Sequence, residues 1–297
     1  MSLTALRESS VISGHDWPVQ SLAFAHSTNL LATGDTQRHV KVWYDGKVLH
    51  ELNLSSREDK VKPTERIRGL AFSPTGDTLY IACGDTLRAV SMTSGEVRWK
   101  YTPPRSFGFL IISPVSLAVS TYGDVAVSTD AGRVLLWTAE GALKAQWWDN
   151  DSPRQLAFLN GEQLIGSDSF SICTWKISTG RKLSRRRVQE RIYGFAATSD
   201  ASKIVLRSIH DIQVWDVVAD VMLAQYGVPY GAPLVSISDQ DRVAVAGVHE
   251  VVVHTPGRKS ITIPLSDASV RSLKIASDGS FVTAGCSDGT IRTWNLS

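Results

Sequence analysis

The sequence predicts an all-β protein, a seven-bladed β-propeller with four antiparallel strands in each blade. Its apolar runs are short, rich in Val, Ile, Leu and Thr, and bounded by Gly, Asp, Ser and Asn, as in SLAFAHSTNLLATGD. Helical periodicity is almost absent, so these runs are expected to be strands joined by tight turns. A strand pattern that ends in a bulky residue also recurs seven times, at intervals of 38 to 47 residues. A unit of about 42 residues is the length of a four-stranded blade.

The recurring pattern is the predicted third strand of each blade. Its copies are HVKVW, TLRAV, RVLLW, SICTW, DIQVW, EVVVH and TIRTW, which end at Trp43, Val90, Trp137, Trp175, Trp215, His254 and Trp294. A predicted innermost strand precedes each copy: VQSLAF, IRGLAF, VSLAV, PRQLAF, IYGFAA, LVSIS and VRSLKI. Because the Trp residues recur at one place per blade, we expect them to fill the space between neighbouring sheets, as large aromatic residues do in cores.

The last unit contains only three strands, because the chain stops three residues after Trp294. A segment without a blade of its own, ALRESSVIS (residues 5–13), precedes the first innermost strand. We expect this segment to supply the fourth, outer strand of the last blade and so close the ring, which removes an unpaired sheet edge. The predicted organisation is one domain over residues 1–297.

The units resemble WD40 repeats. The resemblance is carried by Gly14-His15 before the first innermost strand, by the Trp that ends the third strand in five of seven units, by Trp215-Asp216, and by Asp288 in the turn before Trp294. It covers the whole chain, but no unit has the family's complete network of His, Ser/Thr, Asp and Trp.

The first and last units come closest to that network. The first unit has Gln37 at the Asp position, and the last has Ser266 and Ala284 at the His and Ser/Thr positions. The resemblance implies structural roles for His15, Thr33, Trp43, Trp137, Trp175, Trp215, Asp288 and Trp294.

Composition and the N-terminal segment bear on the cellular location of the protein and on the partner classes it can bind. The net charge of +2 is too small to indicate nucleic acid or a membrane surface. The three cysteines, Cys83, Cys173 and Cys286, are widely spaced and form neither a disulfide framework nor a zinc motif. The N-terminus has charged residues where a signal peptide needs an apolar run, and the longest uncharged stretch, residues 106–123, is interrupted by proline and serines. We therefore expect a cytoplasmic protein without a membrane span.

No catalytic motif is present, and the sequence predicts no catalytic residue, cofactor or metal. The seven histidines have no ligand spacing, and no phosphate-binding or dinucleotide-binding glycine motif occurs. Two acidic clusters, 149–151 and Asp239 with Asp241, could ligate calcium. Asp and Asn also favour turns through local hydrogen bonds, and this is the preferred interpretation.

Arginines recur at the start of the innermost strands, at one mouth of the predicted channel. The position after the first apolar residue of these strands holds Gln20, Arg68, Val115, Arg154, Tyr193, Val235 and Arg271. The position before that residue adds Arg66 and Arg191, and Trp17 and Tyr230 lie close in sequence. In WD40 proteins, residues at these places often contact ligands.

We predict that this mouth binds a partner through Trp17, Arg66, Arg68, Arg154, Arg191, Tyr193, Tyr230 and Arg271. Arg, Tyr and Trp dominate interaction hot spots, and the guanidinium fork suits carboxylate or phosphate. In the alternative interpretation, the arginines pair with the neighbouring acids Glu65, Glu190 and Asp151 and line a wet channel.

Two further segments are candidate secondary contacts. Trp147 and Trp148 lie on a predicted outer strand, where they either contact a partner or pack against the next blade. Arg185, Arg186 and Arg187 lie in the basic run 181–191, which either binds an anionic partner or keeps an edge strand soluble.

The resemblance and the missing catalytic motifs predict a non-catalytic scaffold or adaptor. We expect a monomeric propeller within an intracellular hetero-complex, binding other proteins through an acidic or extended peptide. An enzyme or small-ligand propeller with a site at the channel is the first alternative. An anionic nucleic-acid or phospholipid binder is the second, and the small net charge disfavours it.

Overall fold

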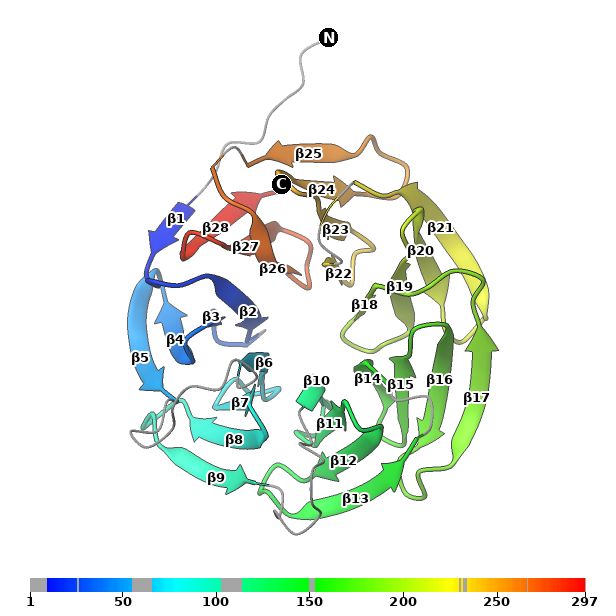
Figure 1. The fold of residues 1–297 in the computed structure, drawn as a ribbon, viewed down its shortest axis with the longest axis horizontal. Coiled ribbons are helices and arrows are strands. Elements are labelled where there is room, and N and C mark those ends of the chain that lie inside the picture. The colour runs from blue at the N-terminus through cyan, green and yellow to red at the C-terminus, as the bar shows by residue number, and fades with distance from the viewer. Residues whose placement is uncertain are drawn as a thin grey trace. The chain divides into compact units, whose positions relative to one another are not determined.

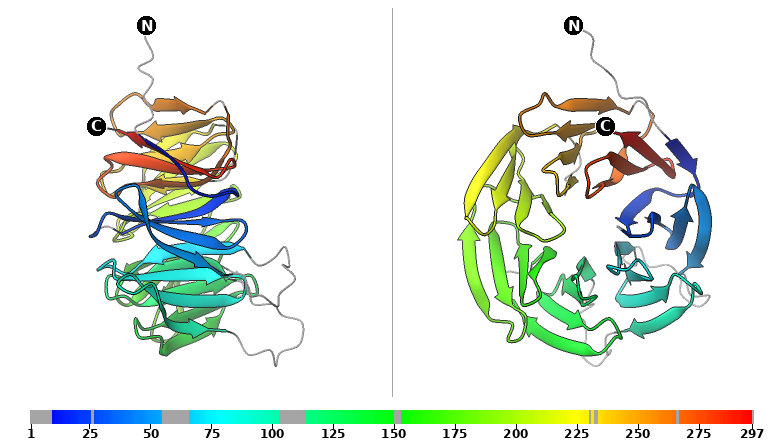
Figure 2. Two further views of the ribbon diagram at one scale, coloured as in Figure 1. Left: turned by 90° about the vertical axis from the view of Figure 1, so that its left-hand side faces the viewer. Right: turned by 180° about the vertical axis from the view of Figure 1, so that it is seen from behind.

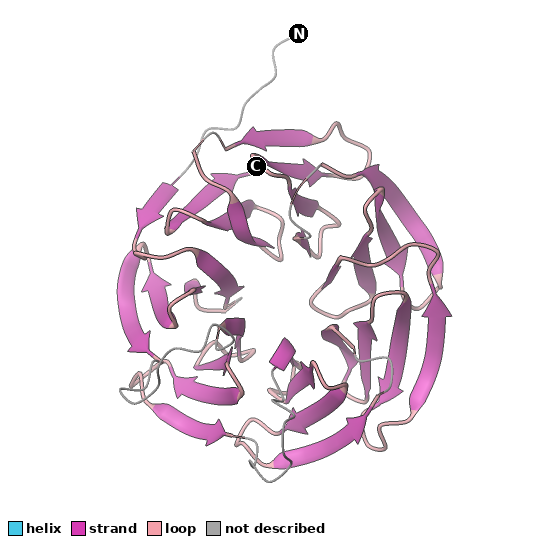
Figure 3. Cartoon of the chain, in the orientation of Figure 1, coloured by secondary structure: helices cyan, strands magenta, loops and turns pink. Residues whose placement is uncertain are grey.

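The protein consists of β-structure in its described parts. The computed structural model describes residues 10–25, 27–54, 66–102, 114–149, 153–229, 231, 234–265 and 267–296. These residues form 28 strands joined mostly by tight turns, and none of them is helical (Figure 3). No helix capable of crossing a membrane therefore occurs among them.

The strands form seven antiparallel sheets of four strands each. Six sheets follow the chain order, from β2-β3-β4-β5 to β22-β23-β24-β25, and the seventh has the order β1-β28-β27-β26. This confirms the prediction of an all-β, seven-bladed propeller. The chain forms two compact units, Met1–Leu22 with Glu190–Ser297, and Ala23–Gln189. The predicted single-domain organisation stays a prediction.

The unit Ala23–Gln189 holds the sheets β6–β9, β10–β13 and β14–β17, together with β3, β4 and β5. Its strands are β3 (Leu30–Asp35), β4 (His39–Tyr44), β5 (Lys47–Asn53), β6 (Ile67–Phe72), β7 (Thr78–Cys83), β8 (Thr86–Ser91), β9 (Val97–Tyr101), β10 (Pro114–Val119), β11 (Val125–Thr129), β12 (Arg133–Trp137), β13 (Leu143–Trp148), β14 (Gln155–Asn160), β15 (Gln163–Ser167), β16 (Ser171–Lys176) and β17 (Lys182–Arg187). The first strands of successive sheets contact one another, β6 with β10 and β10 with β14, while β9, β13 and β17 form the opposite edges (Figure 1).

The other unit holds the sheets β18–β21, β22–β25 and β1-β28-β27-β26. Its strands are β1 (Ser10–Ser13), β18 (Gly194–Ala197), β19 (Lys203–Arg207), β20 (Asp211–Asp216), β21 (Val221–Gly227), β22 (Val235–Ile237), β23 (Val243–Ala246), β24 (Glu250–His254), β25 (Ile261–Pro264), β26 (Val270–Ile275), β27 (Phe281–Cys286) and β28 (Thr290–Asn295), and β2 (Val19–Phe24) begins in it. Here β18 contacts β22, and β22 contacts β26. Consecutive strands of one sheet are joined by short turns, as both views of Figure 2 show.

The N-terminal strand completes the last sheet, as predicted. β1 pairs antiparallel with β28, from Ser10 opposite Thr293 to Ser13 opposite Thr290. The strand is shorter than the predicted segment 5–13, and residues 5–9 lie outside the described residues. Pairing with β1 covers the backbone edge of β28, which would otherwise be free to pair with another chain.

The core lies between neighbouring sheets. Leu136 of β12 packs in one cluster with Leu164 of β15 and Trp175 of β16. Second strands are buried on both faces, so β7 reads as the continuous apolar run TLYIAC rather than as an alternating pattern. Of the third-strand tryptophans, Trp43, Trp137, Trp175 and Trp294 are buried, whereas Trp215 is half-buried.

In the unit Ala23–Gln189, an aromatic side chain of an outer strand packs against a glycine of the next sheet. A Cβ added to Gly95, Gly141 or Gly180 would meet the ring of His50, Trp99 or Trp147, respectively, at 2.6–2.8 Å. The Trp99 indole also donates to the Ala139 carbonyl at 2.9 Å. Each glycine lies in the turn that leads to the outer strand of its own sheet and has a positive φ, so both the turn and the ring contact require it.

His254 occupies the third-strand position at which five other sheets have tryptophan. Its burial leads us to expect that the folded protein loses stability in acid. It is buried, stacks on Tyr226 with ring centroids 4.4 Å apart, and shares a 2.8 Å hydrogen bond with Ser260 through Nδ1. Desolvation by burial lowers the pKa of His254 below its usual 6.5. The neutral ring is therefore favoured in the folded state, and stability is lost as pH falls through 6.5.

We expect the free energy of unfolding to fall by up to about 1 kcal/mol between pH 6.5 and pH 5.5 because of this ring. His254→Phe keeps the stacking and should flatten that part of the pH profile, measured by urea unfolding. His249→Phe changes an exposed histidine and is the matched control. Parallel pH profiles for His254→Phe and the wild type would contradict the assignment.

Candidate interaction surface

Three first strands, β6, β10 and β26, begin with a β-bulge, and the extra residue of each bulge is the position at which the sequence predicts a recurring contact residue. In β6 the pairing register shifts between Ile67 and Gly69, which makes Arg68 the extra residue. Arg271 is the extra residue of β26, and Val115 is that of β10, in the same way. A bulge bends its strand and re-aims the side chain of its extra residue, and Arg68 and Arg271 are both exposed.

Arg154 and Tyr193 occupy the corresponding place in two other sheets, directly before their first strands. Each donates its backbone N–H to the residue opposite the start of that strand, Arg154 to the Ser167 carbonyl and Tyr193 to the Arg207 carbonyl, both at 2.8 Å. The backbone thus places Arg68, Arg154, Tyr193 and Arg271 at equivalent sites.

The predicted contact residues lie at the surface wherever the structure describes them. The exposed residues are Trp17, Arg66, Arg68, Arg154, Arg191, Tyr193 and Arg271. Tyr230 lies outside the described residues. The Arg191 guanidinium lies 5.3 Å from the centre of the Tyr193 ring, a cation–π contact.

These arginine side chains have few internal partners. Among described residues, the guanidinium groups of Arg66, Arg68, Arg154, Arg191 and Arg271 form no hydrogen bond or ion pair. The neighbouring acid Glu190 instead contacts His210, Oε1 to Nδ1 at 2.8 Å. The other two acids of the alternative interpretation, Glu65 and Asp151, lie outside the described residues.

Each compact unit carries its own part of this set. Arg66, Arg68 and Arg154 belong to the unit Ala23–Gln189, where β10 lies between β6 and β14. Trp17, Arg191, Tyr193 and Arg271 belong to the other unit, where β22 lies between β18 and β26. We call these two sets the first-strand surfaces.

Apolar turn residues join the first-strand surfaces and were not predicted. Phe170 is 53% exposed in the turn after β15, at the end of that strand where Ser167 bonds Arg154. Ile209 is 62% exposed in the turn after β19, at the end where Arg207 bonds Tyr193. The sequence feature that could have identified both residues is a large apolar side chain in a turn whose other residues are Ser, Asp or His.

Lys274 was also missed. It is exposed in the middle of β26, three residues after Arg271. The corresponding position in five of the six other innermost strands holds alanine: Ala23, Ala71, Ala118, Ala157 and Ala196. Lys274 is the charged residue at a position where most innermost strands have alanine, and this difference is visible in the sequence.

The WD40-like network is partly assembled in the first unit of the repeat. The Trp43 indole donates to the Thr33 hydroxyl at 2.8 Å. The turn carboxylate is supplied by Asp35 rather than from position 37, because Asp35 Oδ1 accepts the backbone N–H groups of Gln37 and His39. His15 is buried.

In the last sheet, the same kind of turn is held by Asp288. Its Oδ1 accepts the N–H and the hydroxyl of Thr290, and its Oδ2 accepts from Arg292 at 2.8 Å. Burial alone would raise the pKa of Asp288, but these hydrogen bonds and the Arg292 charge outweigh it and lower the pKa. The carboxylate is therefore ionised at neutral pH, where it holds the turn.

The candidate secondary contacts differ in exposure. Trp147 is half-buried against Gly180, whereas Trp148 is 60% exposed with the Arg133 guanidinium 5.5 Å from its ring centre. On β17, Arg185 and Arg187 are exposed and Arg186 is half-buried.

The described carboxylates of the two acidic clusters have protein partners. Asp149 is buried and accepts from the Trp175 indole at 2.6 Å and from Lys182 at 3.1 Å. Asp239 accepts the N–H and hydroxyl of Ser199, and Asp241 pairs with Lys203. Within the described ranges, no three His, Cys, Asp or Glu residues are grouped so that they could hold a metal ion.

Comparison with known proteins identifies two repeats. The WD40 family model, described as "WD domain, G-beta repeat", matches residues 7–44 and 258–295. The first match includes β1 to β4 and the second β25 to β28, so each begins with the outer strand that precedes the first strand of a sheet. A search of curated proteins finds no match. The two matched repeats and the seven four-stranded blades together support a WD40-repeat family for this chain.

Proposed function

We propose that this protein is a non-catalytic interaction scaffold whose first-strand surfaces bind an acidic, extended segment of a partner protein. The observation that carries the proposal is that Arg68, Arg154 and Arg271 are exposed at equivalent sites at the start of their first strands. Their guanidinium groups have no hydrogen-bond or ion-pair partner among the described residues. The fold is one that commonly serves protein interaction in this family, and the proposed setting is an intracellular complex.

The chemistry of these surfaces favours carboxylates on an extended chain. A guanidinium presents several N–H donors in a planar fork that matches a carboxylate, and it remains charged at any physiological pH. Trp17, Tyr193, Phe170 and Ile209 add exposed apolar area beside the arginines, which a purely electrostatic polyanion site would not need. An acidic segment with interspersed apolar residues fits both features.

The test compares captured proteins for the wild type and the triple variant Arg68→Glu/Arg154→Glu/Arg271→Glu. Partners are identified by mass spectrometry after pull-down from native extract, once matching melting curves show that both proteins fold. We expect the variant to lose about tenfold or more of a discrete set of partners, because charge reversal replaces attraction by repulsion.

The matched control is Lys47→Glu/Lys100→Glu/Arg258→Glu, which makes the same charge change at exposed positions away from the first strands and from the basic run 181–191. Retention of the partner set by this control supports the first-strand surfaces. Equal loss from both variants, together with binding of the wild type to heparin and to unrelated oligonucleotides, would overturn the proposal in favour of a general polyanion binder.

A further inference from the structure

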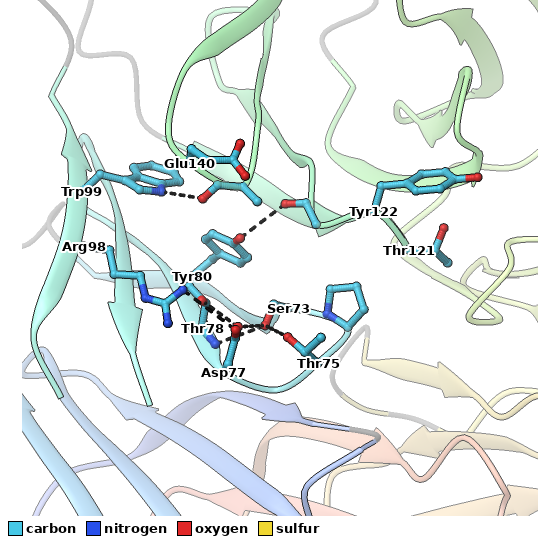
Figure 4. A pocket seen from close by; sticks show the side chains of 13 residues that line it. Ser73, Thr75, Asp77, Thr78, Tyr80, Arg98, Trp99, Thr121, Tyr122 and Glu140 are labelled. Carbon is cyan, nitrogen blue, oxygen red and sulfur yellow. Dashed lines mark hydrogen bonds and ion pairs between the residues drawn. The ribbon is translucent and has the colours of Figure 1, made fainter. Parts of the chain in front are cut away.

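A cavity of about 450 Å³ lies between two neighbouring sheets of the unit Ala23–Gln189 (Figure 4). Turns 73–78 and 121–123 contribute to it, as do residues 139 and 140 of the β12–β13 turn and Arg98 and Trp99 of β9. The turn that begins at residue 73 follows the last residue of β6, whereas Arg68 lies near the first residue of β6. The cavity and Arg68 therefore lie at opposite ends of this strand.

Aromatic rings line the cavity, and two of them have their polar groups already bonded. Tyr80 is only 1% exposed and donates its hydroxyl to the Gly123 carbonyl at 3.3 Å. The Trp99 indole donates to the Ala139 carbonyl, and its ring lies 6.0 Å from that of Tyr80. Tyr122 is 78% exposed at the other side of the cavity. The hydroxyl of Tyr80 and the indole N–H of Trp99 are therefore already bonded, and the exposed ring surface of the cavity belongs to Tyr122 and to half-buried Trp99.

Two carboxylates stand on either side of the Tyr80 ring, Asp77 below it and Glu140 above it in Figure 4. Asp77 Oδ1 accepts the hydroxyls of Ser73 and Thr78 at 2.8 and 2.9 Å, and Asp77 Oδ2 faces Arg98 Nη1 at 3.9 Å. Burial alone would raise the pKa of Asp77, but these hydrogen bonds and the Arg98 charge outweigh it and lower the pKa. A hydrogen bond from Thr138 lowers the pKa of Glu140. Both groups are negative at neutral pH.

Arg98 is the only cation among the described residues that line the cavity, and its ion pair with Asp77 is long. Its Nη1 lies 3.9 Å from Asp77 Oδ2, beyond hydrogen-bond distance, and both side chains are about half exposed. Such solvated ion pairs contribute little to stability. The cavity thus has a net charge of −1 from Asp77, Glu140 and Arg98, and its cation can move aside at little cost.

We propose that this cavity binds the guanidinium group of an arginine side chain presented by a partner protein. A planar cation can pack against the exposed ring surface of Trp99 or Tyr122 and donate to a carboxylate of the cavity, Asp77 or Glu140. The volume lies in the range of about 300–1,000 Å³ that is usual for small-ligand sites. The site does not depend on the first-strand surfaces, whose charge has the opposite sign.

The test is titration of the full chain with N-acetyl-arginine methylamide, monitored by the NMR signal of the Trp99 indole N–H. The signal is assigned with Trp99→Phe. We expect saturable shifts in the millimolar range, and at least about fivefold weaker binding of the citrulline analogue, which has the same shape without the charge.

Variants then separate a cation site from other sites. Glu140→Gln alters an exposed turn residue and should weaken arginine binding about fivefold, whereas Glu96→Gln, in the corresponding turn of the neighbouring sheet, should leave it unchanged. Arg98→Gln removes the competing cation and should strengthen binding about two- to fivefold. Melting curves confirm that each variant is folded.

Several results would overturn the proposal. Equal affinity for the citrulline analogue would show that charge is not recognised, and no shift at 50-fold excess of the arginine probe would show that the cavity does not bind it. Weaker binding by Arg98→Gln, or preference for N-acetyl-glutamate methylamide, would identify an anion site instead.

Discussion

Removal of residues 1–13 is expected to lower the free energy of unfolding by about 2–4 kcal/mol and the melting temperature by about 5–10 °C. The four residues of β1 pair with Thr290–Thr293 of β28, and each lost backbone hydrogen bond costs about 1 kcal/mol. The deletion also leaves β28 as an unpaired edge, so we expect concentration-dependent association in addition. Calorimetry and analytical ultracentrifugation measure the two effects.

The control for this deletion is a shorter one, of residues 1–9, which retains β1. A synthetic peptide of residues 5–16 added to the longer deletion should restore part of the lost stability, because it can supply the missing strand. Unchanged melting after removal of residues 1–13 would count against the role of β1 in the last sheet.

Gly289→Ala should be among the most damaging single substitutions in the last sheet, with a loss of about 3 kcal/mol or more. Gly289 lies in the β27–β28 turn with φ +81°, a conformation that costs a non-glycine residue about 1 kcal/mol. A Cβ there would also overlap the carbonyl oxygen of His15, and neither backbone can withdraw easily. Urea unfolding measures the loss.

Gly257→Ala separates the two contributions. Gly257 has a similar φ of +69° in the β24–β25 turn, but nothing lies within 4 Å of an added Cβ. We expect a loss of only about 1 kcal/mol there. Equal losses for the two variants would mean that the contact between the β27–β28 turn and His15 does not constrain the fold.

The sheets could be predicted from the sequence because each turn and strand pattern is local. Repeated spacing located seven third strands. The position after the first apolar residue of the innermost strands marked a recurring site, which holds Arg68 and Arg271. The same local pattern anticipated that Arg68 and Arg271 are equivalent, and the register adds that both are bulge residues.

Contacts between sheets could not be predicted in the same way, because they join residues about 40 positions apart. Nothing near Trp99 in the sequence marks the residues that its ring contacts. Its bond to Ala139 and its packing on Gly141 depend on how the next sheet is placed. Likewise Asp149, which looked like part of an acidic cluster, is an acceptor for Trp175.

The sequence by itself determined the fold class, the seven repeating units, the strand that completes the last sheet, and the arginines at the start of the first strands. These properties follow from the period of apolar residues and from turn chemistry, which act over a few residues. Only the tertiary structure decided which aromatic rings are covered, which carboxylates already have partners, and that a cavity with a net negative charge lies between β6–β9 and β10–β13. Those properties depend on packing between sheets, where small differences in side-chain volume decide whether a gap is filled or remains open.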